Sequence, residues 1–353
     1  MNHWYWLGAS FLVLTVISAY GSWTAGYQCE LSHGFNPYHE PPFADISQWI
    51  STPGLLADLI VFNRTDTTAA VMKALQLAKP RNLLVAADGP RATRRGEAAL
   101  CAETREVVRR MVNWPCEVNW KCSDENLGCG RGVASAISWA LDKFEEVIVL
   151  EDDCIPHPDF FAFVGEMLDR YRHEPRVMLV SGTNVLHGRY ALPYSYGFSR
   201  YPQTWGWATW RRAWKNFDFD MKIWPVVRDA GLLSDILGNQ QETRYWTRIF
   251  EITKDGKIDT WDYQLHLTMW SHGAYAIYPA SNLVTNIGVQ GTHYSGGGPI
   301  QDIPFAPLEF PLRHPPIIYR DIKAEAVIRE RWYFPSIRDR AINKLRRMTA
   351  APR

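Results

Sequence analysis

The stretch Glu146-Val-Ile-Val-Leu-Glu-Asp-Asp-Cys154 decides how this chain is interpreted. Its apolar part, Val147 to Leu150, is short and rich in β-branched residues, as is typical of a strand buried on both faces. Three carboxylates follow it directly: Glu151, Asp152 and Asp153. Because like charges repel and unpaired burial is costly, this triplet favours a divalent cation, which prefers carboxylate oxygens. The alternative is an acidic turn in which Asp152 or Asp153 caps the next helix.

The composition is that of a globular protein with a sizeable core. Of the 353 residues, 46% are hydrophobic and 21% are charged, and the net charge of +1 gives no sign of nucleic-acid binding. The 16 tryptophans suit both a core and walls that stack on sugar rings. The six cysteines match no zinc-binding spacing, and we interpret them as reduced thiols.

Strand-like and helix-like segments alternate up to Ser181. The predicted strands are 58–63, 82–87, 116–120, 147–150 and 176–181, and the predicted helices are 67–78, 95–112, 131–144 and 159–172. This order predicts right-handed βαβ units and an α/β fold with a mostly parallel, Rossmann-like sheet flanked by helices. No glycine-rich dinucleotide fingerprint or Gly-Lys-Ser/Thr loop indicates NAD or ATP. Beyond Ser181 we expect a long loop over 182–206 and tryptophan-rich helices over 207–217, 240–254 and 260–271.

Polar residues follow successive predicted strands, where they can converge. They are Asn63-Arg64, Asp88 to Arg91, and Ser123 to Arg131. The last segment contains Asn126-Leu-Gly-Cys-Gly-Arg131, whose glycines permit close approach of a ligand and whose following helix N-terminus favours phosphate. Each alone is compatible with an ordinary turn, and their occurrence together is the stronger signal.

The order Asn63-Arg64, Asp88-Gly89, Asn126 to Gly130, then Leu150-Glu-Asp-Asp153 resembles glycosyltransferases of the GT-A fold. Among these it is most similar to the Glu-Asp-Asp group that includes N-acetylglucosaminyltransferases and bacterial relatives. The resemblance covers about residues 56–295 and is most specific at the triplet.

The resemblance implies a set of donor-binding residues. They are Arg64, Asp88, Asn126, Arg131, Glu151 and Asp152. Asp153 would hold Mn²⁺ or Mg²⁺, which bridges the two phosphates of a nucleotide-diphosphate sugar. Glu151 and Asp152 would face the ribose and the donor sugar, while Arg64 and Asp88 would line the nucleoside pocket.

The second half of the chain must supply a base and an acceptor site. Asp259-Thr-Trp-Asp-Tyr263 places carboxylates beside a tryptophan, and a Trp-Asp pair carries the base in the resembled family. Asp262 is the best match, although its spacing from the triplet departs from the animal enzymes, and Asp259 is the substitute if Asp262 is not the base. The predicted sugar walls are Trp205, Trp207 and Trp261, with an aromatic helix packed on the sheet as the alternative. His293 is a candidate for the metal or diphosphate, or a merely exposed loop histidine.

These features predict a metal-dependent, inverting glycosyltransferase that moves a hexosyl or N-acetylhexosaminyl group to a glycan or lipid-linked acceptor. One alternative is a sugar-nucleotide pyrophosphorylase, which would need a glycine-rich loop with a basic residue where Asn63-Arg-Thr-Asp66 stands. Another is a non-catalytic carbohydrate-binding protein of the same fold.

The expected organisation is an apolar segment over 1–23 as a possible membrane anchor, a linker or arm over 24–54, a catalytic domain over 55–300 and an extension over 301–353. The extension carries a basic amphipathic helix that is compatible with an anionic membrane surface or with solvent. Asn63-Arg-Thr65 is a glycosylation sequon, and a glycan there would block the donor. We therefore predict a bacterial-type, membrane-associated protein on the cytoplasmic face, active in polysaccharide biosynthesis.

Overall fold

The computed structural model describes residues 56–288 and 303–334. The apolar segment over 1–23, the linker over 24–54, His293 and the basic helix expected beyond Pro335 lie outside the described residues. Within the part that is described, no helix has the length and apolar character needed to cross a membrane.

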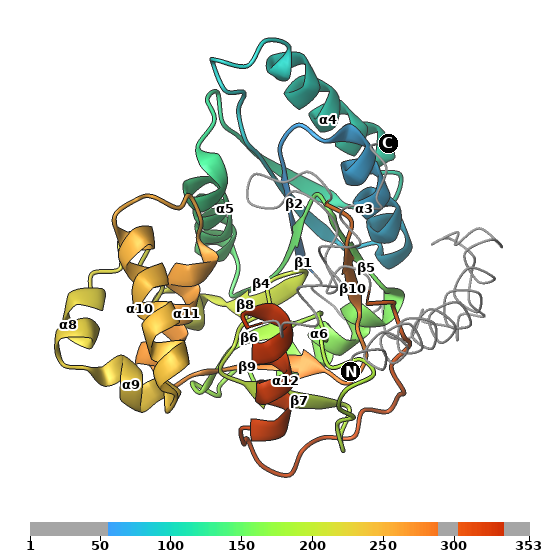
Figure 1. The fold of residues 1–353 in the computed structure, drawn as a ribbon. Coiled ribbons are helices and arrows are strands. Elements are labelled where there is room, and N and C mark those ends of the chain that lie inside the picture. The colour runs from blue at the N-terminus through green and yellow to red at the C-terminus, as the bar shows by residue number, and fades with distance from the viewer. Residues whose placement is uncertain (1–55, 289–302, 335–353) are drawn as a thin grey trace, which may run out of the picture. The chain divides into compact units, whose positions relative to one another are not determined.

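The core of the fold is an eight-stranded sheet in the order β3-β2-β1-β4-β8-β6-β9-β7 (Figure 1). The strands are β1 Leu56–Val61, β2 Asn82–Ala87, β3 Glu117–Cys122, β4 Glu146–Glu151, β6 Val177–Ser181, β7 Tyr196–Ser199, β8 Trp207–Trp210 and β9 Tyr275–Pro279. Because only β8 and β7 pair antiparallel with their neighbours, the other six strands run in one direction. A second, antiparallel pair joins β5 (Cys154–Pro156) to β10 (Val284–Asn286). The predicted α/β fold with a mostly parallel, Rossmann-like sheet is confirmed.

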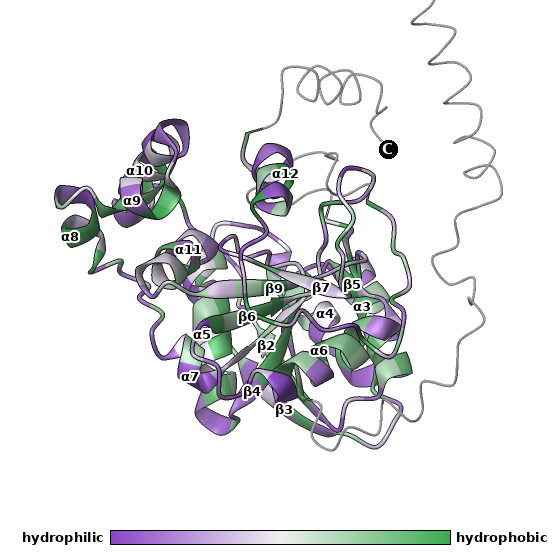
Figure 2. Ribbon diagram, turned by 90° about the horizontal axis from the view of Figure 1, so that it is seen from below, coloured by the Kyte–Doolittle hydropathy of each residue, from purple (hydrophilic) through white to green (hydrophobic). Residues whose placement is uncertain are grey.

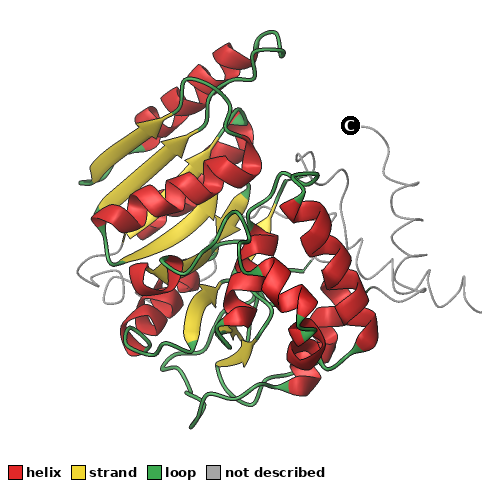
Figure 3. Cartoon of the chain, turned by 90° about the vertical axis from the view of Figure 1, so that its left-hand side faces the viewer, coloured by secondary structure: helices red, strands yellow, loops and turns green. Residues whose placement is uncertain are grey.

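Helices cover both faces of the sheet (Figure 3). They are α3 Thr65–Ala78, α4 Glu97–Met111, α5 Gly128–Lys143, α6 Pro158–Arg170, α7 Arg211–Trp214, α8 Trp224–Asp229, α9 Leu232–Leu237, α10 Gln240–Lys254, α11 Asp262–Ser271 and α12 Ile322–Trp332. Buried residues of α3, α4 and α6 form one hydrophobic cluster, and those of α5, α7, α8, α9, α10, α11 and α12 form the other.

Strand β4 divides its side chains between these two clusters. Val147 and Val149 belong to the cluster with α5, whereas Ile148 and Leu150 belong to the cluster with α6. Since successive side chains of a strand point to opposite faces, this alternation shows that β4 is covered on both sides. Strands β2 and β6 of the same sheet are likewise largely hydrophobic, as their green colour in Figure 2 shows.

The structure corrects three predictions near the sheet. Trp207 to Trp210 forms the central strand β8, not part of a helix, because the rings of these two tryptophans enter opposite clusters. The helix after the triplet begins at Pro158 with His157 as its N-cap, so the interpretation of Asp152 or Asp153 as a helix cap was wrong. The segment 182–206, expected as one loop, contains β7.

Helix α12 belongs to the same core as the sheet. Ala324 and Ile328 are fully buried in the cluster of α5 and α11. Glu325, which is 4% exposed, accepts hydrogen bonds from the backbone N–H of Arg200 at 2.8 Å and from Nη2 of Arg320 at 2.7 Å. The described part of the expected C-terminal extension is therefore integral to the fold.

Glu325→Gln should lower the free energy of unfolding by about 1.5–3 kcal/mol, the range for a hydrogen bond to a charged group. The amide keeps one acceptor oxygen but no longer neutralises Arg320, with which Glu325 is ion-paired. Chemical denaturation measures the change. Glu330→Gln on the same helix is the control, because the side chain of Glu330 is 52% exposed and should contribute little.

Asp58 lies in the middle of β1 with neither oxygen hydrogen-bonded within the described residues. Burial raises its pKa from the ordinary 3.8 to about 7, with Lys121 opposing the shift. Between about pH 4 and pH 7 the unfolded chain loses this proton while the folded chain keeps it, so stability should fall as the pH rises through that window. Asp58→Leu, a change between side chains of similar shape, should make this slope shallower by the contribution of one proton in denaturation measured across the window, whereas Asp124→Leu on an exposed loop should leave the slope unchanged.

Candidate functional site

The carboxyl ends of four parallel strands lie at one edge of the sheet. The register places Val61 of β1 beside Ala87 of β2, Ala87 beside Cys122 of β3, and Ile60 beside Glu151 of β4. The polar segments that follow these strands are therefore neighbours, and such an edge is where open α/β sheets bind ligands.

Arg64, at the N-terminus of α3, holds two carboxylates of the triplet. Its Nη1 donates to Oδ2 of Asp153 at 2.8 Å, and its Nη2 and Nε donate to the two oxygens of Asp152. The backbone N–H of Phe62 also donates to Asp152, at 3.4 Å. Burial nevertheless raises the pKa of Asp152 to about 6, because its desolvation outweighs the effect of Arg64.

Glu151 connects the triplet to the predicted base. Its pKa is raised to about 8, first by burial and then by the charges of Asp153 and Asp152, and Asp262 adds to the shift. Asp262, at the start of α11, is therefore near enough for its charge to act on Glu151, at the end of β4. The partly buried thiol of Cys129 lies among the same acids, since burial and the charges of Glu151 and Asp262 raise its pKa.

Asp153 is also contacted by the chain around β10. Asn286 Nδ2 donates to Asp153 Oδ1 at 3.2 Å, and the N–H of Ile287 donates to the Asp153 carbonyl at 2.8 Å. A Cβ at Gly288 would collide with Asp153 Oδ2, so this close approach of the backbone to Asp153 requires glycine. The loop 286–293 was of interest for His293, which lies outside the described residues, whereas Asn286, which contacts Asp153, was not among the predicted site residues.

A metal ion would have few protein ligands here. Within residues 56–288 and 303–334, no group of three or more His, Cys, Asp or Glu side chains is arranged to hold one. The triplet offers the oxygens of Glu151 and Asp153, and the latter already receives Arg64 and Asn286.

Asp88 and Asn126 join two loops at the same edge. Asp88 Oδ1 accepts hydrogen bonds from the N–H groups of Gly89 and Leu127, both at 2.9 Å, and Asn126 Nδ2 donates to Asp88 Oδ2 at 2.8 Å. A Cβ at Gly89 would lie 2.5 Å from the backbone of Glu125. The two predicted donor-binding residues therefore also fix each other in place.

The N-terminus of α5, which we expected to attract phosphate, is occupied by a carboxylate of the chain itself. The helix begins at Gly128, three residues earlier than predicted. The N–H groups of Cys129 and Gly130 donate to Oδ2 and Oδ1 of Asp259, each at 2.9 Å. Arg131 points elsewhere, with its guanidinium 4.8 Å from the ring centre of Phe219.

Asp262 is the first residue of α11, and its two carboxylate oxygens differ. Oδ1 accepts hydrogen bonds from Thr260 Oγ1 and from the N–H of Tyr263, whereas Oδ2 accepts none from any described residue. Burial lowers the pKa of His266, so its neutral ring donates from Nδ1 to the carbonyl of Asp262 at 2.8 Å. Its Nε2 then accepts from the Tyr333 hydroxyl at 2.7 Å.

The three predicted wall tryptophans differ in exposure. Trp207 and Trp261 are 1% and 3% exposed and stack on each other, with centroids 5.4 Å apart and planes at 17°. These two rings present almost no surface to a sugar in this structure. Trp205 is partly buried, and its ring centre lies 5.0 Å from that of Trp332 in α12.

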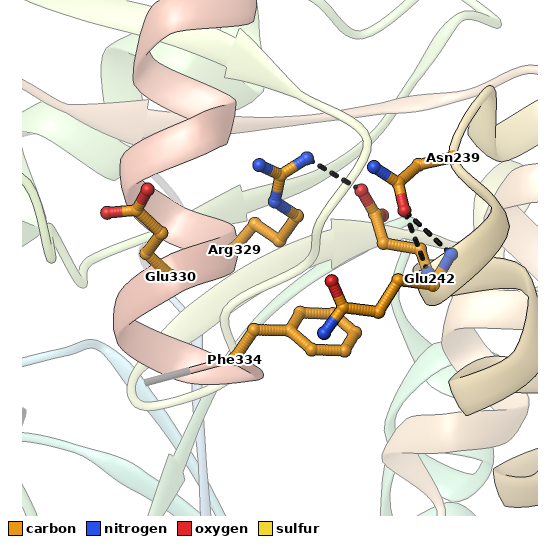
Figure 4. A pocket seen from close by; sticks show the side chains of 6 residues that line it. Asn239, Glu242, Arg329, Glu330 and Phe334 are labelled. Carbon is orange, nitrogen blue, oxygen red and sulfur yellow. Dashed lines mark hydrogen bonds and ion pairs between the residues drawn. The ribbon is translucent and has the colours of Figure 1, made fainter. Parts of the chain in front are cut away.

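A pocket of about 200 Å³ lies between α10 and α12 (Figure 4). Its lining residues are Asn239, Gln241, Glu242, Arg329, Glu330 and Phe334. Arg329 Nη1 is paired with Glu242 Oε1 at 3.0 Å across it. None of the predicted site residues lines this pocket.

No protein-family model and no curated protein matches this chain. Among solved structures, this chain shows a weak similarity to UDP-glucose pyrophosphorylase complexed with UDP-glucose. It is 9% identical in sequence with a TM-score of 0.32, and the match covers 64% of this chain and 90% of that one. A likeness at this level supports no conclusion on substrate or activity.

Proposed function

We propose that this chain is a metal-dependent glycosyltransferase of the GT-A type, which moves a sugar from a nucleotide-diphosphate sugar to a glycan or lipid-linked acceptor. The observation that carries the proposal is the convergence of two acids from distant parts of the chain. Burial and the neighbouring Asp153 and Asp152 raise the pKa of Glu151, at the end of β4, and the charge of Asp262, at the start of α11, adds to this shift. This arrangement could serve a donor on one side and an acceptor on the other.

Asp153, with Glu151 beside it, would hold Mn²⁺ or Mg²⁺. Proteins commonly bind Mg²⁺ through only one or two carboxylates together with substrate phosphates, so the two carboxylates found among the described residues fit this ion. Burial raises the pKa of Glu151 and the charges of Asp153 and Asp152 raise it further, and a bound cation would stabilise the ionised form against both effects. When bound, such an ion would neutralise the charge that develops on the leaving diphosphate.

Asp262 would act as the base. Thr260 and the Tyr263 N–H fix Oδ1, which leaves Oδ2 able to accept a proton from an acceptor hydroxyl. The acceptor oxygen would form the new bond to the anomeric carbon while the bond from that carbon to the diphosphate breaks, giving inversion. Trp205 is the one predicted wall residue with surface left for a sugar ring.

Calorimetry with a panel of nucleotide-diphosphate sugars, with and without Mn²⁺, tests the proposal. We expect at least one donor to bind only when the metal is present, and the same donor to be hydrolysed slowly without acceptor. Absence of binding across the panel would contradict the proposal. Formation of nucleoside triphosphate from a bound donor and pyrophosphate would favour the pyrophosphorylase alternative.

We also propose a membrane-associated location, because the sequence has an apolar segment over 1–23 and basic residues beyond Pro335. We place the protein on the cytoplasmic face of a bacterial-type cell, because a glycan on the sequon at Asn63 would block the proposed donor site. Asn63 Nδ2 donates to Glu97 Oε1 at 3.0 Å, a bond that a glycan on this nitrogen would disturb. Fractionation should place the full chain with membranes and a version starting near residue 50 in the soluble fraction. Equal solubility of both would exclude this placement.

A further inference from the structure

Asp259 joins two parts of the chain that are distant in sequence. It precedes α11 and accepts hydrogen bonds from two consecutive N–H groups at the start of α5, those of Cys129 and Gly130, each at 2.9 Å. Asp259 is exposed, so solvent screens its charge, and what the contact provides is geometry more than electrostatic energy.

The glycines of α5 are matched to this contact. A Cβ at Gly130 would lie 2.8 Å from Asp259 Oδ1 and 2.8 Å from the carbonyl oxygen of Thr260. A Cβ at Gly128 would collide with Asp259 Oδ2, and the φ of +79° at Gly128 also favours glycine. The glycines of the turn 126–131, which we expected to permit close approach of a ligand, therefore make room for the loop that carries Asp259.

The contact connects the two sides of the candidate site. On one side, Asn126 and Leu127 directly precede α5 and hold Asp88 at the donor edge. On the other side, Thr260 follows Asp259 and donates through Oγ1 to Asp262. An unbroken run of short contacts thus leads from the donor-side loop to the candidate base.

We infer that Asp259 is a positioning residue, which sets the place of Asp262 relative to the donor by fixing its loop on the N-terminus of α5. This inference rests on the proposed function. Both carboxylate oxygens of Asp259 already accept hydrogen bonds from the backbone of α5, so Asp259 is poorly suited to be the base itself. Displacement of a reacting group by about 1 Å can cost on the order of 100-fold in rate, so a loss of this contact should reduce turnover.

The test compares Asp259→Ala, Gly130→Ala and the double variant in the full chain. Each single change should lower kcat by about 10- to 100-fold while donor affinity stays within about twofold. Because both changes break one contact, the double variant should be no slower than the slower single variant. Asp259→Asn keeps one acceptor oxygen and should lie between the parent and Asp259→Ala. Asp255→Ala, in the same exposed loop, is the matched control and should retain the parent kcat.

A residue that only capped α5 would behave differently. Loss of a cap typically costs about 1 kcal/mol of stability, which thermal melting would show, and kcat measured well below the melting temperature would be unchanged. That result for Asp259→Ala would overturn the inference, as would additive effects in the double variant. If Gly130→Ala does not fold, the kcat values of the other variants test the inference. They should fall from the parent to Asp259→Asn and again to Asp259→Ala, and equal values would overturn it.

Hydrogen exchange separates this inference from the proposed function. The amides of Cys129 and Gly130 should exchange slowly in the parent and faster in Asp259→Ala, whatever the activity. A parent protein that binds no nucleotide sugar would remove the proposed function and the positioning role with it, while exchange would still report the contact. If Asp259→Ala binds the donor and its amides exchange faster, but its kcat is unchanged, the positioning role is refuted and the proposed function is not.

Discussion

Replacing Asp153 with Asn should abolish metal-dependent donor binding while leaving the fold intact. Asp153 is more accessible than its neighbour Asp152, since its side chain is 13% exposed whereas that of Asp152 is 4% exposed. Changes to residues that merely support a metal ligand already cost about 10- to 100-fold in affinity, so removing a ligand should cost at least about 100-fold. Calorimetry of the donor with and without Mn²⁺ measures this loss.

The control for this experiment is Asp235→Asn, which removes one carboxylate from the exposed surface of α9. It changes the net charge equally and should bind donor as the parent does. Unchanged Mn²⁺-dependent binding in Asp153→Asn would show that the triplet does not hold the metal. Circular dichroism should show that the variant remains folded despite the altered pairing with Arg64.

Asp262→Asn should lower kcat by about 10²- to 10⁴-fold, the usual contribution of a general base, with donor affinity retained. The amide can still accept from Thr260 and the Tyr263 N–H, so the start of α11 should be preserved. It cannot take a proton from an acceptor hydroxyl at neutral pH. Transfer kinetics measured beside donor calorimetry separate the two effects.

Asp255→Asn is the matched control, because it lies in the exposed turn after α10 and should leave transfer unchanged. If Asp262→Asn transferred sugar at the rate of the parent, another residue would have to be the base. Asp259 would be the weaker substitute, because its oxygens are bound to the backbone of α5.

The parts of the fold that sequence analysis predicted well are those with local signals. The second predicted strand, 82–87, coincides with β2, and the apolar run of β4 ends at the triplet as expected. Strand β8 was missed because four residues rich in tryptophan have no periodicity that separates a strand from a helix. Its identity depends on the neighbours β4 and β6, which are distant in the sequence.

The candidate site shows the same division. The convergence of strand ends follows from a parallel sheet, so Arg64, Asp88 and Glu151 could be grouped from the sequence. The bonds within the group could not, since Arg64 to Asp153 spans 89 residues and Asn286 to Asp153 spans 133. No local pattern encodes which donor meets which carboxylate across such separations.

The burial of α12 determines where the chain can be cut. A fragment ending at residue 300, the boundary drawn from the sequence, would lack Ala324 and Ile328 and would uncover the apolar surface against which they pack. It would also remove the ring of Tyr333 from its place 4.9 Å from that of Trp246. Such a fragment should be recovered as aggregates, so shortened versions made for crystallisation or domain exchange need to extend through Phe334.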